Sequence, residues 1–143
     1  EYIMKELVKK ADMEDSFYIA SAATSWGNVG SPVYPNAKEM LEAHGIDCSA
    51  KRSIHLEKSD YDKYDFIIGM DKANIRDMKK ICGGDPQGKM YRLLQFAGED
   101  RDLADPWYTR DFQTAWDDLV KGCNGLMRQI LQTRVQTENT ARA

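Results

Sequence analysis

The chain has 143 residues, of which 42% are hydrophobic and 30% charged, and its formal net charge at pH 7 is −3. This composition fits a single globular domain over residues 1–143 and argues against nucleic acid as a main partner, which would need a clustered basic face. It also argues against a membrane-spanning helix, because no apolar run approaches the roughly 20 residues that such a helix requires.

The first predicted element is a helix that is already under way at residue 1. Its apolar residues recur at helical spacing, namely Ile3, Met4, Leu7, Val8 and Ala11. No serine, threonine, aspartate or asparagine precedes them to cap the first turn. We therefore expect the chain to begin inside a helix and a segment upstream to be missing.

Three short apolar runs predict strands that are buried on both faces, at residues 16–23, 66–70 and 90–94. Helices are predicted between and after them, over residues 37–44 and 72–81 and from residue 112 onward. The tail at 132–143 is expected to fray. Strands that are apolar throughout and alternate with helices imply an α/β domain, in which helices cover both faces of a parallel sheet.

The most informative stretch follows the third strand and reads Asp105-Pro106-Trp107-Tyr108. Proline keeps the residue before it out of the helical region, so the Asp105 carboxyl has a defined direction. Trp107 and Tyr108 are flat and amphipathic, and they suit a wall that grips an aromatic ligand. This arrangement suits proton delivery to a phenolic leaving group; the alternative is a turn before a helix, with both rings in the core.

The cysteine and histidine residues show no pattern that is typical of a disulfide framework or a metal site. The three cysteines form no pairwise framework, so we expect reduced thiols and a cytoplasmic compartment. His44 and His55 have no carboxylate or cysteine at metal-ligand spacing. We therefore expect neither a metal site nor a cofactor.

A series of short segments in a fixed order carries a family resemblance. The segments are residues 21–25, 44–46, 65–71, 74, 76–77, 92–94 and 105–108. In this order they resemble the low-molecular-weight protein-tyrosine phosphatases over nearly the whole chain. The resemblance implies a phosphotyrosine protein phosphatase I-like fold. It also implies hydrolysis of a phosphotyrosine protein or a small aryl phosphate through a cysteinyl-phosphate.

The resemblance also implies roles for individual residues. Asp105 would protonate the tyrosine oxygen as it leaves and then act as base toward water. Trp107 and Tyr108 match a pair of adjacent aromatics, one of which borders the phenol site, and Trp26 lies where an aromatic commonly borders the pocket. Ser21 matches a serine that steadies the phosphate loop.

The family's phosphate loop has the form Cys-x5-Arg-Ser and follows the first strand, and this sequence does not contain it. Cys48 is followed by Arg52-Ser53, but the three intervening residues are too few to ring a phosphate. Cys82 has no arginine at the required distance, and Cys123 lies inside a predicted helix, where backbone N–H groups are already bonded. We therefore predict that this chain lacks the nucleophile and is inactive.

The absent loop and the uncapped first helix together suggest a family member without its first strand, which by resemblance lies inside the sheet. Burial of one interior strand contributes a free energy comparable with the stability of a whole domain. We therefore expect a homodimer or a rearranged sheet if the sequence is complete.

Two other functions stay open. The chain could be a non-catalytic phosphatase-like binding module that keeps the pocket walls for phosphotyrosine or protein contacts. It could also be an arsenate reductase of the same fold, for which Cys82 is suggestive. That activity needs a second cysteine nearby, and residues 83–92 contain none.

Overall fold

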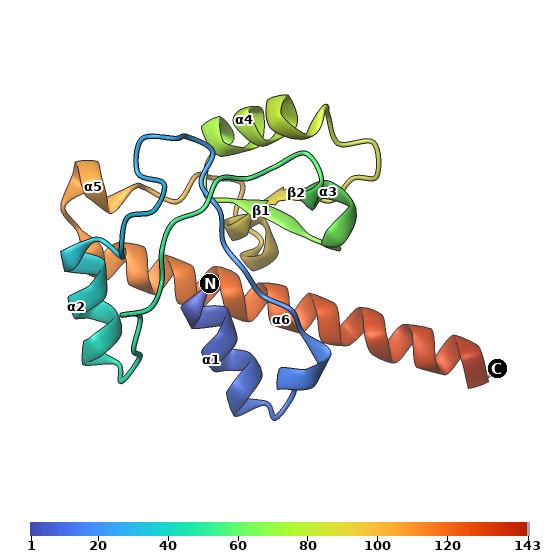
Figure 1. Ribbon diagram of the computed structural model, residues 1–143. Helices are drawn as coiled ribbons and strands as arrows, with labels where there is room; N and C mark the ends of the chain where they lie inside the picture. The colour runs from blue at the N-terminus through green and yellow to red at the C-terminus, as the bar shows by residue number, and fades with distance from the viewer. Residues whose placement is uncertain (143) are drawn as a thin grey trace.

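The computed structural model describes residues 1–142 (Figure 1). Its helices are α1 (Tyr2–Lys10), α2 (Pro35–Ala43), α3 (Asp60–Lys63), α4 (Lys72–Cys82), α5 (Pro106–Thr109) and α6 (Phe112–Arg142). The remaining elements are the 3-10 turns η1 (Glu14–Ser16) and η2 (Leu93–Ala97) and the strands β1 (Ile67–Gly69) and β2 (Met90–Arg92). Within the described part of the chain, no helix combines the length and the apolar character needed to cross a membrane.

The sheet separates two hydrophobic cores. β1 pairs with β2 in parallel, with Ile67 opposite Met90 and Gly69 opposite Arg92. Ile67 belongs to the smaller core with α3 and α4, whereas Ile68 packs against the larger core that α1, η2 and α6 build. In Figure 1, α4 accordingly lies on one side of the strands and α6 with α1 on the other. The predicted parallel sheet with helices on both faces is confirmed in these two strands.

The prediction of a buried strand at residues 16–23 is wrong, because this segment neither pairs as a strand nor is buried on both faces. Ser16 ends η1, residues 17–22 are not part of any strand, and only Ala23 forms a parallel bridge, with His55. Tyr18 is 82% exposed, so the segment is not buried on both faces. A strand needs backbone hydrogen bonds to a neighbour. Within residues 1–142, the backbone of residues 18–22 makes none.

Other elements agree with the predictions except at their ends. The strand predicted at 90–94 stops at Arg92, because the next residues turn into η2. Asp71 caps α4, since its carboxylate accepts the Asn74 backbone N–H at 2.7 Å. Gly83 ends the helix in the left-handed region, with φ of 79°, where glycine carries no steric penalty.

α6 is helical as far as Arg142, which includes the turns that we expected to fray. The side chains of residues 132–141 are exposed and lie outside both hydrophobic cores. Helical turns without tertiary packing are held only by local interactions, among which is the Arg134–Glu138 pair at 3.5 Å. Fraying of these turns in solution stays a prediction, and residue 143 lies outside the described residues.

Candidate functional site

Asp105 follows a segment that is anchored at the carboxyl ends of both strands. The Leu103 N–H donates to the Met70 carbonyl, one residue beyond β1, at 2.9 Å. The buried Arg92 at the end of β2 holds the Asp102 carboxylate at 3.0 Å. These contacts place the start of α5 close to the rim where ligands of parallel sheets bind.

The Asp105 carboxylate is oriented by its own helix. The backbone before Pro106 is extended, with φ of −72° and ψ of 116°, and Oδ1 accepts the Trp107 N–H at 2.9 Å. Within the described residues, Oδ2 accepts no hydrogen bond, and the side chain is exposed. Oδ2 is therefore free to carry a proton toward a ligand.

The two aromatics after Pro106 do not lie in the core. Trp107 is 51% exposed and Tyr108 is 81% exposed, so the alternative of two buried rings is wrong. Trp107 instead meets Tyr34 edge to face, with ring centroids 4.9 Å apart. The Arg110 guanidinium lies 5.4 Å from the centre of the Trp107 ring and donates to the Tyr34 hydroxyl at 3.1 Å. We call Tyr34, Trp107 and Arg110 the aromatic clamp.

Two members of the aromatic clamp, Tyr34 and Arg110, were not predicted from the sequence. Tyr34 precedes Pro35 and is extended, with φ of −56° and ψ of 137°. The rule that gave Asp105 a direction therefore applies to Tyr34 as well. Arg110 carries no comparable signal, since its position depends on a left-handed φ of 61° at the end of α5.

Trp26 forms a separate wall. Its ring stacks on His55 with centroids 3.9 Å apart and planes 5° from parallel, and it is 70% exposed. Within residues 1–142, no ring contact joins Trp26 to Trp107 or Tyr108. The predicted pocket residues thus lie on two separate aromatic surfaces.

The Ser21 hydroxyl donates to the Glu1 carboxylate at 2.7 Å. The ammonium groups of Lys5 and Lys51 reach the same carboxylate at 2.6 Å each. Burial would raise the pKa of Glu1, but the hydrogen bonds from Lys5, Lys51 and Ser21 outweigh it and lower that pKa to about 2. Glu1, Ser21 and Lys51 are among the residues that line a hollow of about 280 Å³, so this hydrogen-bonded group lies at its wall. The role of Ser21 beside a phosphate loop stays a prediction.

All three cysteines are free and buried. Burial raises the pKa of the Cys82 and Cys123 thiols, which keeps them protonated at neutral pH. Arg52, the arginine nearest to Cys48 in sequence, donates to the carbonyls of Ser49 and Lys51. Within the described residues, no group of three His, Cys, Asp or Glu side chains is placed to hold a metal ion.

A family model, a related sequence and two solved structures all match this chain over most of its length. The family model described as low molecular weight phosphotyrosine protein phosphatase matches residues 1–138. Low molecular weight protein-tyrosine-phosphatase PtpA of Staphylococcus aureus is 29% identical over 133 residues, which cover 92% of this chain and 84% of that protein. The crystal structure of YfkJ from Bacillus subtilis superposes with a TM-score of 0.88 at 27% identity, over 93% of this chain and 85% of the other. SP-PTP, a low molecular weight protein tyrosine phosphatase from Streptococcus pyogenes, gives a TM-score of 0.79 at 28% identity, over 90% and 81% of the two chains.

Proposed function

This chain belongs to the low molecular weight phosphotyrosine protein phosphatase family, and from that premise we propose that its site receives phosphotyrosine in a protein or a small aryl phosphate. Asp105 is the proposed general acid, and Trp107 and Tyr108 are the proposed wall beside the phenol ring. Trp26, on the separate surface that it forms with His55, is the proposed second wall. One observation carries the proposal: an exposed carboxylate, oriented by its own helix cap, lies directly beside the exposed aromatic clamp.

We also propose that this 143-residue chain does not turn over substrate. Phosphoryl transfer to cysteine needs an accessible thiolate, and the pKa of such a thiol is depressed by neighbouring positive charge. Cys48, Cys82 and Cys123 are buried, and the pKa values of the last two are raised. This combination supports a site that retains the proton donor without an activated nucleophile.

The 143-residue chain is expected to release no p-nitrophenol from p-nitrophenyl phosphate above the buffer rate, either as a burst or in the steady state. The measurement is absorbance at pH 5–7, with Asp105→Asn as the matched variant. In the absence of turnover, the two proteins give the same background.

A burst equal to the enzyme concentration that is lost in Asp105→Asn would contradict the proposed inactivity and still support Asp105 as the acid. Cys48→Ser, Cys82→Ser and Cys123→Ser would then identify the attacking sulfur. Each substitution removes a single thiol, so only one of them should abolish the burst.

A second candidate, the non-catalytic binding module, is favoured by the exposure of the aromatic clamp. Isothermal titration with a phosphotyrosine peptide should show binding that the unphosphorylated peptide lacks. Trp107→Ala should weaken it about twofold to tenfold, the range expected for loss of one aromatic contact. Val135→Ala, at an exposed position on the last turns of α6, is the control. Equal affinity in both variants would rule out the clamp as the contact surface.

A second copy of the chain is a proposed partner. A cytoplasmic, reducing compartment is proposed because all three thiols are free. Arsenate reduction is not favoured, since Cys82 is buried and its pKa is raised, whereas a redox-active thiol needs exposure.

A further inference from the structure

Arg110 has a backbone conformation that is unfavourable for any residue with a side chain. It ends α5 in the left-handed region, with φ of 61° and ψ of 13°. Within the described residues, Asp12 is the only other non-glycine residue with a positive φ. Glycine would adopt this conformation without a steric penalty. A strained position that is occupied by an arginine beside the proposed site is therefore a candidate for a function of its side chain.

The contacts of Arg110 hold its guanidinium in place without neutralising the charge. Nη1 donates to the Tyr34 hydroxyl at 3.1 Å, and Cζ lies 5.4 Å from the centre of the Trp107 ring. A hydroxyl and an aromatic face are both uncharged, and within residues 1–142 Arg110 forms no ion pair. A guanidinium carries five N–H donors. Most of the donors of this exposed side chain are therefore available to a ligand.

The carboxylates nearest to Arg110 in sequence accept hydrogen bonds from their own helix ends instead. Asp105 accepts the Trp107 N–H at 2.9 Å. Asp111 accepts the Thr114 N–H at 3.0 Å with one oxygen and the Thr114 hydroxyl at 2.7 Å with the other. The guanidinium is thus left as a positive charge on the surface beside Trp107.

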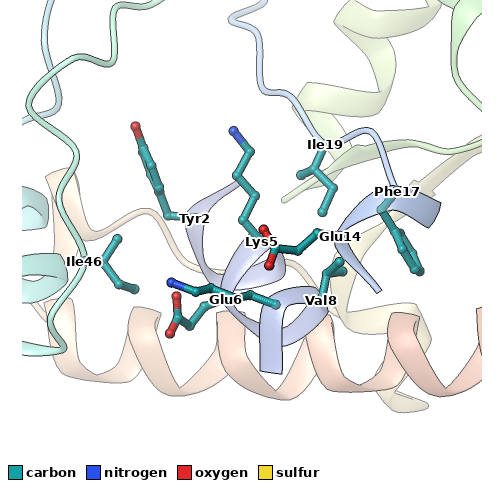
Figure 2. Close-up of a pocket in the computed structure, with 9 residues that line it drawn as sticks. Tyr2, Lys5, Glu6, Val8, Glu14, Phe17, Ile19 and Ile46 are labelled. Atoms are coloured by element: carbon teal, nitrogen blue, oxygen red, sulfur yellow. The ribbon is translucent and has the colours of Figure 1, made fainter. Parts of the chain in front are cut away.

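Cations elsewhere around the predicted site residues are already paired with carboxylates. These pairs are Lys51–Glu1, Arg92–Asp102 and Arg101–Asp118. The hollow beside α1 in Figure 2 is balanced in charge as well, since two lysines and two glutamates border it, namely Lys5, Lys9, Glu6 and Glu14. Among these groups, Arg110 is the cation that is best placed to select an anionic ligand.

We propose that Arg110 binds a carboxylate next to the phosphotyrosine of a bound peptide, so that the site prefers phosphotyrosine with aspartate or glutamate beside it. This inference rests on the proposed function, in which Trp107 borders the phenol ring. Consecutive Cα atoms are about 3.8 Å apart, so a residue that flanks a tyrosine on Trp107 is within reach of Cζ, 5.4 Å from the Trp107 ring centre. The planar guanidinium matches the two oxygens of a carboxylate.

Isothermal titration with two phosphotyrosine peptides tests this preference. The peptides carry either glutamate or glutamine on both sides of the phosphotyrosine, so they differ in charge and hardly in shape. The parent chain should bind the glutamate peptide about twofold to fivefold more tightly at low salt, the range for an exposed ion pair. The difference should shrink as salt is added.

Two variants show whether Arg110 causes the preference. Arg110→Gly removes the guanidinium and suits the left-handed backbone, so it should bind both peptides equally and unfold at the same or a higher temperature than the parent. Lys9→Ala also removes one exposed cation, but in the hollow beside α1, and it should keep the preference.

The other outcomes overturn the inference in distinguishable ways. If Arg110→Gly weakens both peptides by the same factor, Arg110 binds the phosphate and not a flanking carboxylate. Equal affinity of the parent chain for the two phosphopeptides contradicts the inference and leaves the proposed function standing. Failure of the parent chain to bind either phosphopeptide contradicts both.

Discussion

Leu94→Ala should lower the free energy of unfolding by about 2–5 kcal/mol, the range for loss of a large buried side chain that leaves a cavity. Leu94 is 0% exposed and stands in η2, between the strands and α6, in the larger core. The cavity cannot be filled easily, because both neighbours are regular elements. The measurement is urea unfolding followed by circular dichroism.

Val135→Ala is the control for this substitution. It also shortens an aliphatic side chain, but at a position that is 55% exposed, so it should change stability by less than about 0.5 kcal/mol. Since whole domains are stable by only about 5–15 kcal/mol, Leu94→Ala is expected to shift the urea midpoint clearly, whereas Val135→Ala is not. Equal stability of the two variants would show that η2 is not packed as described.

Gly125→Ala should also destabilise the fold, by about 1–3 kcal/mol or more, even though alanine is normally the better helix former by about 1 kcal/mol. A Cβ atom at Gly125 would lie 2.2 Å from the Phe96 carbonyl oxygen. That oxygen belongs to the backbone of η2 and cannot rotate away, so η2 and α6 must separate. Chemical unfolding and the loss of near-ultraviolet circular dichroism report this separation.

Two other glycines make a graded control series for Gly125→Ala. At Gly122, the added carbon would lie 2.4 Å from Cγ of the buried Leu93, which must repack, but a side chain can shift more than the backbone that blocks Gly125, so the loss should be smaller than at Gly125. At Gly27 nothing lies within 4 Å, so alanine should be neutral. An effect that does not decrease from Gly125 through Gly122 to Gly27 would refute steric contact as the cause.

Local features of the chain were predictable from residues alone. The cap at Asp71 and the extended Asp105 before Pro106 follow from rules that involve neighbours only a few residues away. Helical spacing and strand-helix alternation likewise indicated α1, α4, α6 and the parallel pair β1–β2. The family assignment was also reached from the sequence, because its segments recur in a fixed order along the chain, and the family model confirms it.

The candidate site was predictable only in part. Asp105, Trp107 and Tyr108 are adjacent in sequence, so their grouping needed no tertiary information. The Tyr34 and Trp107 rings meet although more than 70 residues separate them in the sequence. The hydrogen bond from Arg110 to the Tyr34 hydroxyl likewise spans 76 residues. Contacts at such separations depend on how α2 and α5 pack, which no local pattern reports.

The family, the local elements and the direction of the Asp105 carboxylate could therefore be predicted from the residues alone. Only the tertiary structure could show that residues 17–22 have no neighbouring strand within residues 1–142, and that Trp26 stacks on His55 whereas Trp107 packs against Tyr34. The physical reason is that hydrophobic periodicity reports what one segment can bury, whereas a strand exists only when a second segment supplies the opposite half of its backbone hydrogen bonds.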